Sequence, residues 1–245
     1  MTTEPDRVEF DPVRGEPDHY DADYYDGNGQ AGDRPALRWY VRMVRRYVGP
    51  GPYLDFGCGT GHLLRRLGEH DRAAGFEISP YSAAMARGTA PGCVVYTALD
   101  EIPDATFRGL TAIHVLEHID DATVTEVLAC WKRVLVPGGR ALVVVPDPAG
   151  RARALAGESW TGYLDPTHIN LKSHAEWRAF LADAGFRLVR EGSDGLWNVP
   201  YSKLPKLLDA LQHAVPSLVQ FLAGRLFLRP GAGESGVFVI EKSER

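Results

Sequence analysis

The sequence predicts an α/β fold in which helices cover both faces of a mostly parallel β-sheet. Three observations support this prediction. Apolar segments with strand character alternate with amphipathic helical segments along most of the chain. A glycine turn, Gly57 to Gly61, joins the first predicted strand to a helix. An acid, Glu77, ends the next predicted strand about 20 residues further on, which is a common arrangement at nucleoside sites.

The predicted elements follow one another in a regular order. Strands are expected near 52–56, 73–77, 93–96, 110–114, 140–145, 186–190 and 236–241, and helices near 35–47, 61–69, 80–87, 122–134 and 174–184. Asp33 and Pro35 are a typical helix start, with an N-cap acid and a proline in the first turn. Residues 192–235 break the alternation, with an apolar helical stretch from Leu207 to Leu228 that is interrupted at Pro216 and Gly224.

Composition limits the function classes. A chain of 245 residues, 44% hydrophobic and 24% charged, can bury one large core. We expect residues 1–17 to be a flexible lead-in and residues 18–245 to form one domain. The net charge of -5 and the lack of a basic run with interleaved aromatics argue against a nucleic-acid partner. Three unpatterned cysteines suggest a reducing, cytoplasmic setting, and we expect no signal peptide and no integral membrane segment.

The glycine turn indicates the kind of ligand. Its spacing is G-x-G-x-G, and His62 occupies the position where a dinucleotide-binding loop has its third glycine. The turn also lacks the Gly-Lys-Ser/Thr ending of a phosphate loop. Asp55 in the same segment would repel a phosphate, so the turn favours a nucleoside that carries an ammonium or a sulfonium.

Five segments together resemble one family. They are Leu54 to Gly61, the acid Glu77, His114 to Ile119, Val134 to Gly139 and Asp183 to Phe186. In this order they resemble the motifs of class I S-adenosylmethionine-dependent methyltransferases. The resemblance implies a three-layer α/β/α, Rossmann-like methyltransferase fold, with a seven-stranded, mostly parallel sheet that ends in a β-hairpin. It also implies S-adenosylmethionine as cofactor, S-adenosylhomocysteine as its product, and a substrate-covering insertion at residues 192–235.

The resemblance assigns a set of cofactor residues. Asp55 would organise the loop or the methionine ammonium, Glu77 would hold the ribose hydroxyls, and Asp100 would bind the adenine amino group. The Asp100 assignment departs from the family pattern, because Thr97 or Ala98 occupies the equivalent position. The complete predicted cofactor set is Asp55, Gly57, Cys58, Gly59, Gly61, Glu77, Ile78, Leu99, Asp100 and His114. For Cys58, packing is the favoured role over nucleophilic chemistry.

Two histidines are the candidate catalytic residues. An oxygen acceptor usually needs a base, and imidazole titrates near neutral pH. His114 and His168 are therefore the candidate bases, although either could instead be held by local hydrogen bonds, and His118 is expected to brace its loop. His114, Glu117 and His118 also spell an inverted zinc-protease motif, but that motif requires a helix and this segment follows a strand. A second metal hypothesis stays open, because relatives that methylate quinone-ring catechols resemble this motif, with a glutamate in place of His114, and some of them use a divalent ion there. We expect no metal.

The sequence says less about the molecule that accepts the methyl group. The end of the fourth strand lacks the Asn/Asp-Pro-Pro-Tyr/Phe pattern that grips planar amides, which leaves small molecules as acceptors. We expect O-methylation in a biosynthetic pathway, with N- or C-methylation, or a non-catalytic cofactor-binding scaffold, as alternatives. The aromatic candidates for acceptor binding are Tyr24, Trp160, Tyr163, Trp197 and Tyr201. The apolar residues of 192–235 could also form a homodimer interface or a membrane-facing patch.

Overall fold

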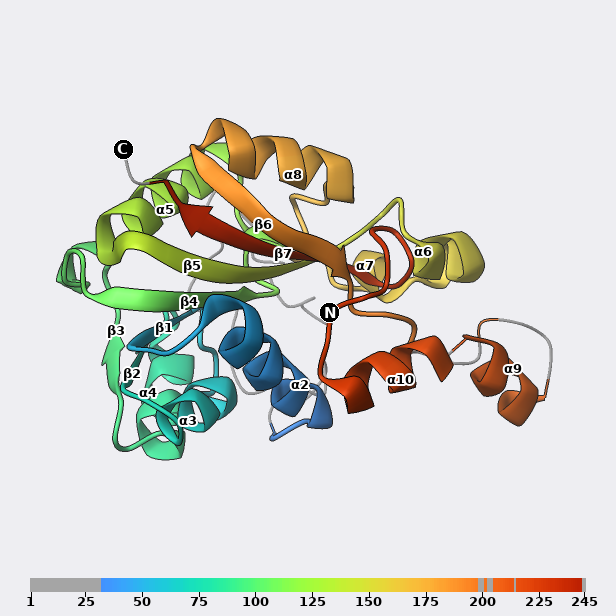
Figure 1. Cartoon of the computed structure of the whole chain (residues 1–245), viewed down its shortest axis with the longest axis horizontal. Helices are drawn as coiled ribbons and strands as arrows, with labels where there is room; N and C mark the ends of the chain where they lie inside the picture. Colours follow the sequence, from blue (N-terminus) through green and yellow to red (C-terminus); the bar gives the residue numbers. More distant parts are fainter. Residues whose placement is uncertain (1–31, 198–200, 202–204, 214, 244–245) are drawn as a thin grey trace, which may run out of the picture.

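A seven-stranded sheet forms the centre of the molecule (Figure 1). The computed structural model describes residues 32–197, 201, 205–213 and 215–243. The strands are β1 Tyr53–Phe56, β2 Ala73–Phe76, β3 Val94–Tyr96, β4 Phe107–Ile113, β5 Leu135–Pro146, β6 Phe186–Ser193 and β7 Ser235–Lys242. Their order is β3-β2-β1-β4-β5-β7-β6, and only β7 runs antiparallel to its neighbours. This confirms the predicted sheet and its terminal hairpin.

Helices cover both faces of the sheet, as predicted. On one face lie α2 Pro35–Met43, continued by a wider π turn over Val44–Val48, then α3 His62–Gly68 and α4 Pro80–Thr89 (Figure 1). On the other face lie α5 Asp121–Val134 and α8 His174–Asp183. Two short helices that the sequence did not predict, α6 Arg151–Ala156 and α7 Thr161–Leu164, follow β5. No helix among the described residues is long and apolar enough to span a bilayer.

The central strands are apolar on both sides because both sides are covered. In β5, Val143 packs into the core under α5 and α8, while its neighbour Leu142 packs into the core under α2 and α3. Phe238 and Val239 of β7 divide between the same two cores. This alternation follows from the two-residue period of a strand. It explains why β5 and β7 appear in the sequence as continuous apolar runs.

The helices α4, α5 and α8 begin with the expected side-chain caps. The side chain of Ser79 accepts a hydrogen bond from the Ser82 backbone N–H at 3.2 Å, and Asp120 accepts one from Thr123 at 2.7 Å. The prediction that Asp33 caps α2 was wrong, because the N-cap residue is Arg34. Asp33 instead accepts a hydrogen bond from Arg66 of α3 at 2.8 Å, which ties the entry of α2 to α3.

The segment predicted as an insertion lies between the last two strands, β6 and β7. It connects Ser193 to Ser235 and contains α9 Lys206–His213 and α10 Val215–Ala223. The predicted interruption at Gly224 is confirmed, because this residue adopts a left-handed conformation (φ 58°) and the chain turns back, whereas Pro216 lies within α10 and does not interrupt it. Leu226 is then buried in the core under α2, so it is not part of an exposed patch. The predicted lead-in, residues 1–17, lies outside the described residues.

Candidate active site

A cavity of about 260 Å³ opens at the carboxyl ends of β1, β2 and β4. This is the edge at which open parallel sheets bind ligands, beside the point where the strand order reverses. Its walls are the glycine turn after β1, the end of β2, the segment after β4, and the start of α2. Of the ten predicted cofactor residues, eight line it: Asp55, Gly57, Cys58, Gly59, Glu77, Ile78, Leu99 and His114.

The glycine turn is held open by backbone hydrogen bonds. The N–H groups of Gly57 and Cys58 both donate to the carbonyl of Phe76, at 2.8 and 3.0 Å. Gly57 has φ 69°, and a Cβ there would lie 2.6 Å from Val115 Cγ2. A side chain would therefore be strained and would clash at this position. The turn presents bare backbone to the cavity, which is the surface that a nucleoside ligand requires.

Glu77 is a structural element of the glycine turn as well as a cavity acid. Its Oε2 accepts the Gly59 backbone N–H at 2.9 Å, and its Oε1 accepts the Ser79 backbone N–H at 2.9 Å. Burial raises the pKa of Glu77, and these backbone hydrogen bonds counteract that effect. Each carboxylate oxygen has a second lone-pair site, so Glu77 can accept ligand hydroxyls while it holds the turn.

Asp55 supplies a second buried acid at the same end of the sheet. Its Oδ1 accepts a hydrogen bond from the Thr111 hydroxyl on β4 at 2.7 Å. Burial raises the pKa of Asp55 to about 7, and the charge of Glu77 adds to this rise, against the Thr111 hydrogen bond. Two neighbouring carboxyl groups would repel a phosphate and would attract a cationic ligand. The residues of the cavity therefore fit S-adenosylmethionine, which carries both an ammonium and a sulfonium.

The other predicted cofactor residues differ in their positions. Gly61 begins α3, and a Cβ there would lie 2.7 Å from Ala86 Cα, so this glycine allows α3 to pack closely on α4. Asp100 is exposed on the turn after β3 and lies outside the cavity lining. The thiol of Cys58 is buried and its pKa is raised well above the ordinary value by burial, which agrees with a packing role.

His114 is the predicted base that borders the cavity. It follows directly after β4 and has φ 56°, a left-handed conformation that costs a non-glycine residue about 1 kcal/mol or more. Its Nδ1 lies 3.0 Å from Oε1 of the fully buried Glu117. Burial alone would lower the pKa of His114, but the hydrogen bond and charge of Glu117 outweigh it and raise that pKa. The pKa of Glu117 is lowered by the same pairing, against burial.

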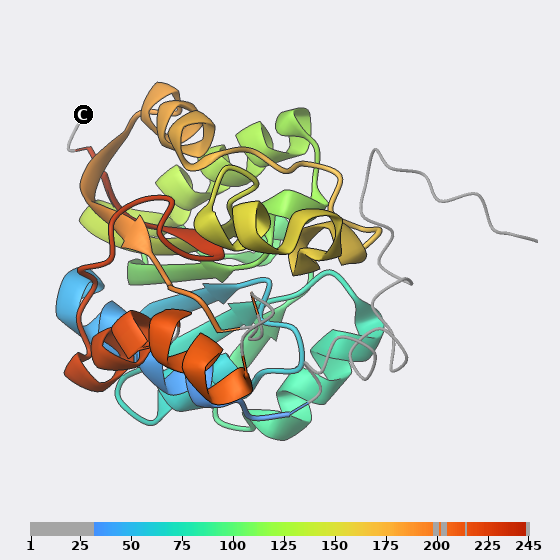
Figure 2. The ribbon, with the colours of Figure 1, turned by 90° about the vertical axis from the view of Figure 1, so that its right-hand side faces the viewer.

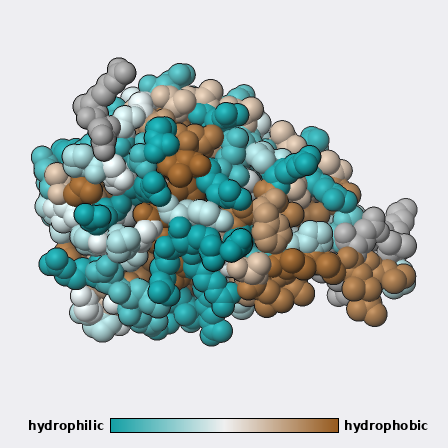
Figure 3. Space-filling model, viewed as in Figure 1, coloured by the Kyte–Doolittle hydropathy of each residue, from teal (hydrophilic) through white to brown (hydrophobic). Residues whose placement is uncertain are grey.

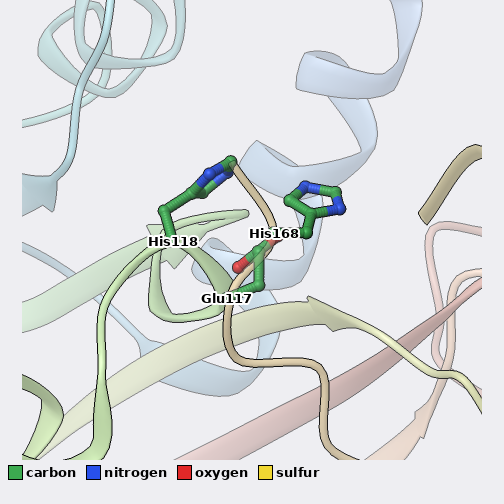
Figure 4. Close-up of side chains that lie close together, drawn as sticks. All are labelled: Glu117, His118 and His168. Carbon is green, nitrogen blue, oxygen red and sulfur yellow. The ribbon is translucent and has the colours of Figure 1, made fainter. Parts of the chain in front are cut away.

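His118 and His168 lie close to each other and to Glu117, and His118 also lines the cavity (Figure 4). Their rings are 4.7 Å apart, His118 Nδ1 lies 2.8 Å from the Thr167 hydroxyl, and His168 Nδ1 lies 2.8 Å from the Gly162 carbonyl. The predicted bracing of the loop by His118 fits its bond to Thr167, which joins the segment after β4 to the segment after β5. His168 is largely buried and does not line the cavity, so it can reach an acceptor only through another group or after a rearrangement.

Glu117, His118 and His168 are also the residues that could hold a metal. One ligand atom from each lies within 4.8 Å of the others (Figure 4). All three already contact protein groups, namely His114, Thr167 and Gly162. Our expectation that the protein uses no metal stays a prediction, and chelation tests it.

The four predicted aromatic acceptor residues that the structure describes do not line the cavity. Trp160 and Tyr201 are buried and pack with Leu196 in a small core of their own. Tyr163 and Trp197 are partly exposed and lie outside the lining. Tyr24 lies outside the described residues.

Several lining residues were not predicted. Gly32 and Arg34 precede α2, Leu37 lies in its first turn, and His62 lies in the first turn of α3. Arg34 and Leu37 lie outside the motifs, so no local pattern marked them. Asp194, directly after β6, does not line the cavity, but its charge acts on His114 and it was not predicted either. Burial, with the charge of Glu234, raises the pKa of Asp194 to about 6, and the charge of His114 opposes this rise.

Comparison with known proteins agrees with this geometry. A family model described as a methyltransferase domain matches residues 30–191. No curated protein matches the sequence. A SAM-dependent methyltransferase from Archaeoglobus fulgidus superposes with a TM-score of 0.59 at 18% identity, over 89% of this chain and 99% of that one.

Two further solved structures are similar at the same level. A possible histamine N-methyltransferase from Thermotoga maritima has a TM-score of 0.63 and 18% identity, covering 90% of this chain and 95% of its own. The mitomycin 7-O-methyltransferase MmcR has a TM-score of 0.59 and 19% identity, over 90% of this chain and 56% of that one. At these identities the likeness shows the fold. With the family match over residues 30–191, the chain belongs to the class I S-adenosylmethionine-dependent methyltransferases and uses S-adenosylmethionine as its methyl donor.

Proposed function

We propose that this methyltransferase transfers the methyl group to a hydroxyl oxygen of a small molecule in a biosynthetic pathway. The observation that carries the proposal is the pair formed by His114 and Glu117 at the edge of the cavity. An amine in its neutral form needs no base before attack, whereas a hydroxyl does. A histidine that a buried carboxylate orients and makes more basic is the group such an acceptor requires.

The chain's own residues divide the work between binding and proton transfer. When bound, S-adenosylmethionine supplies an electrophilic methyl group on its sulfonium. The backbone of the glycine turn, Glu77 and Asp55 would hold the nucleoside and amino-acid parts of the cofactor at the carboxyl edge of the sheet. In-line displacement depends mainly on positioning, so these residues would contribute chiefly by holding the cofactor and the acceptor in place.

The tautomer of His114 follows from its partner. The pKa of Glu117 is lowered, so its carboxylate is ionised at neutral pH and the nearby Nδ1 of His114 carries a proton. The lone pair then resides on Nε2, which can accept the proton of the acceptor hydroxyl. Glu117 stabilises the imidazolium that results, as the carboxylate does in a histidine–carboxylate pair of a hydrolase.

The test compares acceptor classes and two variants. Purified protein is incubated with methyl-labelled S-adenosylmethionine and a panel of phenols, aliphatic alcohols, amines and activated carbon acids. We expect labelled methyl ethers from one hydroxylated class. Products labelled only on nitrogen or carbon would overturn the proposal.

The His114→Asn variant separates the base from the fold. Asparagine tolerates the left-handed conformation that His114 adopts, so this change removes the imidazole with little backbone strain. We expect turnover to fall about 10²- to 10⁴-fold, with little change in S-adenosylhomocysteine affinity. The His70→Asn variant, on an exposed residue after α3, is the matched control. If His114→Asn retains full turnover on a hydroxylated acceptor, His114 is not the base.

A further inference from the structure

The insertion helices α9 and α10 are packed with their polar sides inward and their apolar sides outward. In α10, Ser217 and Gln220 are buried, whereas Leu218, Val219 and Leu222 are exposed, Leu222 to 68%. In α9, Asp209 and His213 are buried, whereas Leu207, Leu208 and Leu211 are exposed, Leu207 to 73%. Figure 3 shows the resulting apolar surface over these two helices. This is the reverse of the usual pattern for a helix on the surface of a soluble domain.

The buried polar side chains fix this orientation. Gln220 Oε1 accepts the backbone N–H groups of Phe227 and Leu228, both at 2.9 Å, and its Nε2 donates to the Ser193 carbonyl at 2.9 Å. Ser217 Oγ accepts the Leu196 N–H at 2.7 Å, and Asp209 accepts the Tyr201 N–H at 2.8 Å. Rotating either helix to hide its leucines would break these bonds and leave buried polar groups unpaired. The apolar side therefore stays outward.

Arginines from a different part of the chain border the same surface. Arg42 of α2 donates to the Phe221 carbonyl at 3.2 Å, and Arg46 donates to the Gly224 carbonyl at 3.1 Å, so α2 lies against α10 (Figure 2). Arg42, Arg45 and Arg46 form a hollow with Leu222, Ala223 and Gly224. Arg225 is exposed immediately after α10. The border is thus made of cationic side chains beside exposed leucines.

Within the described residues of these segments, acidic side chains do not offset the arginines on the exposed side of the surface, since the one acid within α9, Asp209, is buried and faces inward. The sequence has no Asp or Glu from residue 34 to residue 50, and none from residue 210 to residue 233, although the whole chain has a net charge of -5. An apolar helix face with a purely cationic border is complementary to the interface of an anionic bilayer. A second copy docked through the same surface would bring two sets of arginines together, which is unfavourable.

We propose that α9, α10 and four bordering arginines form a docking surface for an anionic lipid bilayer, with the leucines inserted among the acyl chains and the arginines at the phosphate level. The arginines are Arg42 of α2, Arg45 and Arg46 of the π turn that follows it, and Arg225 after α10. We call these residues the lipid-facing surface. The cavity opens at the carboxyl ends of the parallel strands, and the insertion begins at the carboxyl end of β6, which is parallel to β5. Docking would therefore hold the sheet edge that carries the active site toward the bilayer. The proposal does not depend on which atom is methylated.

Vesicle flotation with the full chain tests the proposal. We expect wild type to float with vesicles of 30% phosphatidylglycerol in phosphatidylcholine, to bind pure phosphatidylcholine vesicles much less, and to lose binding as salt is raised. Leu218→Asp with Leu222→Asp should weaken partitioning by at least tenfold, because two inserted leucines are lost. Arg45→Gln with Arg225→Gln should weaken it about fivefold for each arginine.

Matched controls separate docking from misfolding. Val94→Asp changes an exposed apolar residue on the edge strand β3, at the other end of the sheet, and Arg108→Gln changes an exposed arginine at the start of β4. Both should bind vesicles as wild type does. All variants should keep the circular dichroism spectrum and S-adenosylhomocysteine affinity of wild type.

Two results would overturn the proposal. One is that wild type fails to float with anionic vesicles even at low salt. The other is that the leucine variants float as well as Val94→Asp does. If sedimentation shows instead a dimer that the leucine changes dissociate, and no vesicle binding, the lipid-facing surface is an interface between two copies of the chain.

Discussion

Replacing Glu77 with alanine should weaken both the fold and cofactor binding, because this carboxylate serves both. Its two oxygens accept the backbone N–H groups of Gly59 and Ser79, each at 2.9 Å, and the side chain is 6% exposed. The sequence alone suggested a loss of cofactor affinity. The hydrogen bonds add a loss of stability, since the glycine turn depends on the same side chain.

The two effects can be given magnitudes. An unpaired buried N–H costs about 1–3 kcal/mol, so two of them cost about 2–6 kcal/mol. Because Glu77 borders the cavity, water can reach the vacated space, and we expect the lower part of this range, about 2–3 kcal/mol. Losing two charge-assisted hydrogen bonds to ligand hydroxyls, at about 1.5–3 kcal/mol each, should weaken S-adenosylhomocysteine binding about 10²- to 10⁴-fold.

Two measurements on one preparation check these values. Urea unfolding gives the change in the free energy of unfolding, and calorimetric titration with S-adenosylhomocysteine gives the affinity at a temperature where the variant is folded. Glu69→Ala is the control, because Glu69 is a half-exposed partner of Arg65 whose removal should change little. A folded Glu77→Ala protein that binds S-adenosylhomocysteine as tightly as wild type would refute the role of Glu77 in the site.

Three further predictions concern protonation and metal. Turnover on a hydroxylated acceptor should rise with pH as His114 loses its proton, with a midpoint above the ordinary histidine pKa of 6.5. The Glu117→Gln variant should lower that midpoint. An unchanged midpoint would show that the Glu117 carboxylate does not set the pKa of His114. Asp55 has a folded-state pKa of about 7 against an ordinary 3.8, so the folded state binds its proton more tightly than the unfolded state. The contribution of Asp55 to the free energy of unfolding should therefore fall by up to about 4 kcal/mol as pH rises from 4 to 7. In urea unfolding, the free energy of unfolding of Asp55→Asn should fall less over this pH range than that of wild type. Equal falls would exclude Asp55 as the source. Dialysis against EDTA should leave activity unchanged; a loss that a divalent cation restores would instead identify Glu117, His118 and His168 as a metal site.

Much of the fold could be predicted because its signals are local. The strand β1, the glycine turn and the start of α3 are adjacent in sequence, and their residue types restrict the backbone directly. Capping at Ser79 and Asp120 is local in the same way. The prediction at Asp33 was wrong because a partner 33 residues away, Arg66, provided a better contact than the helix end did.

The residues predicted to bind the cofactor were mostly placed at the cavity, whereas the described residues predicted to bind the acceptor were not. Eight of the ten predicted cofactor residues line the cavity, since they lie within or just after strands whose ends converge. The aromatic residues Trp160 and Tyr201 could not be placed, because composition does not say whether a ring packs inward or faces a ligand. Arg34 reaches the cavity, and Asp194 acts on His114, only through the tertiary fold, and no local pattern marks either residue.

The sequence by itself determined the class of fold, the methyl donor and the sign of charge at the cofactor site, because glycine spacing and acidic residues act on their immediate surroundings. Only the tertiary structure decided that His114 pairs with Glu117 beside the cavity, while His168 lies outside its lining. It also decided the lipid-facing surface, since the arginines of α2 and of the π turn after it are about 180 residues from the leucines of α10 in the chain and meet them only through packing. Contacts over such separations are set by how elements fit together in space, which one stretch of sequence does not encode.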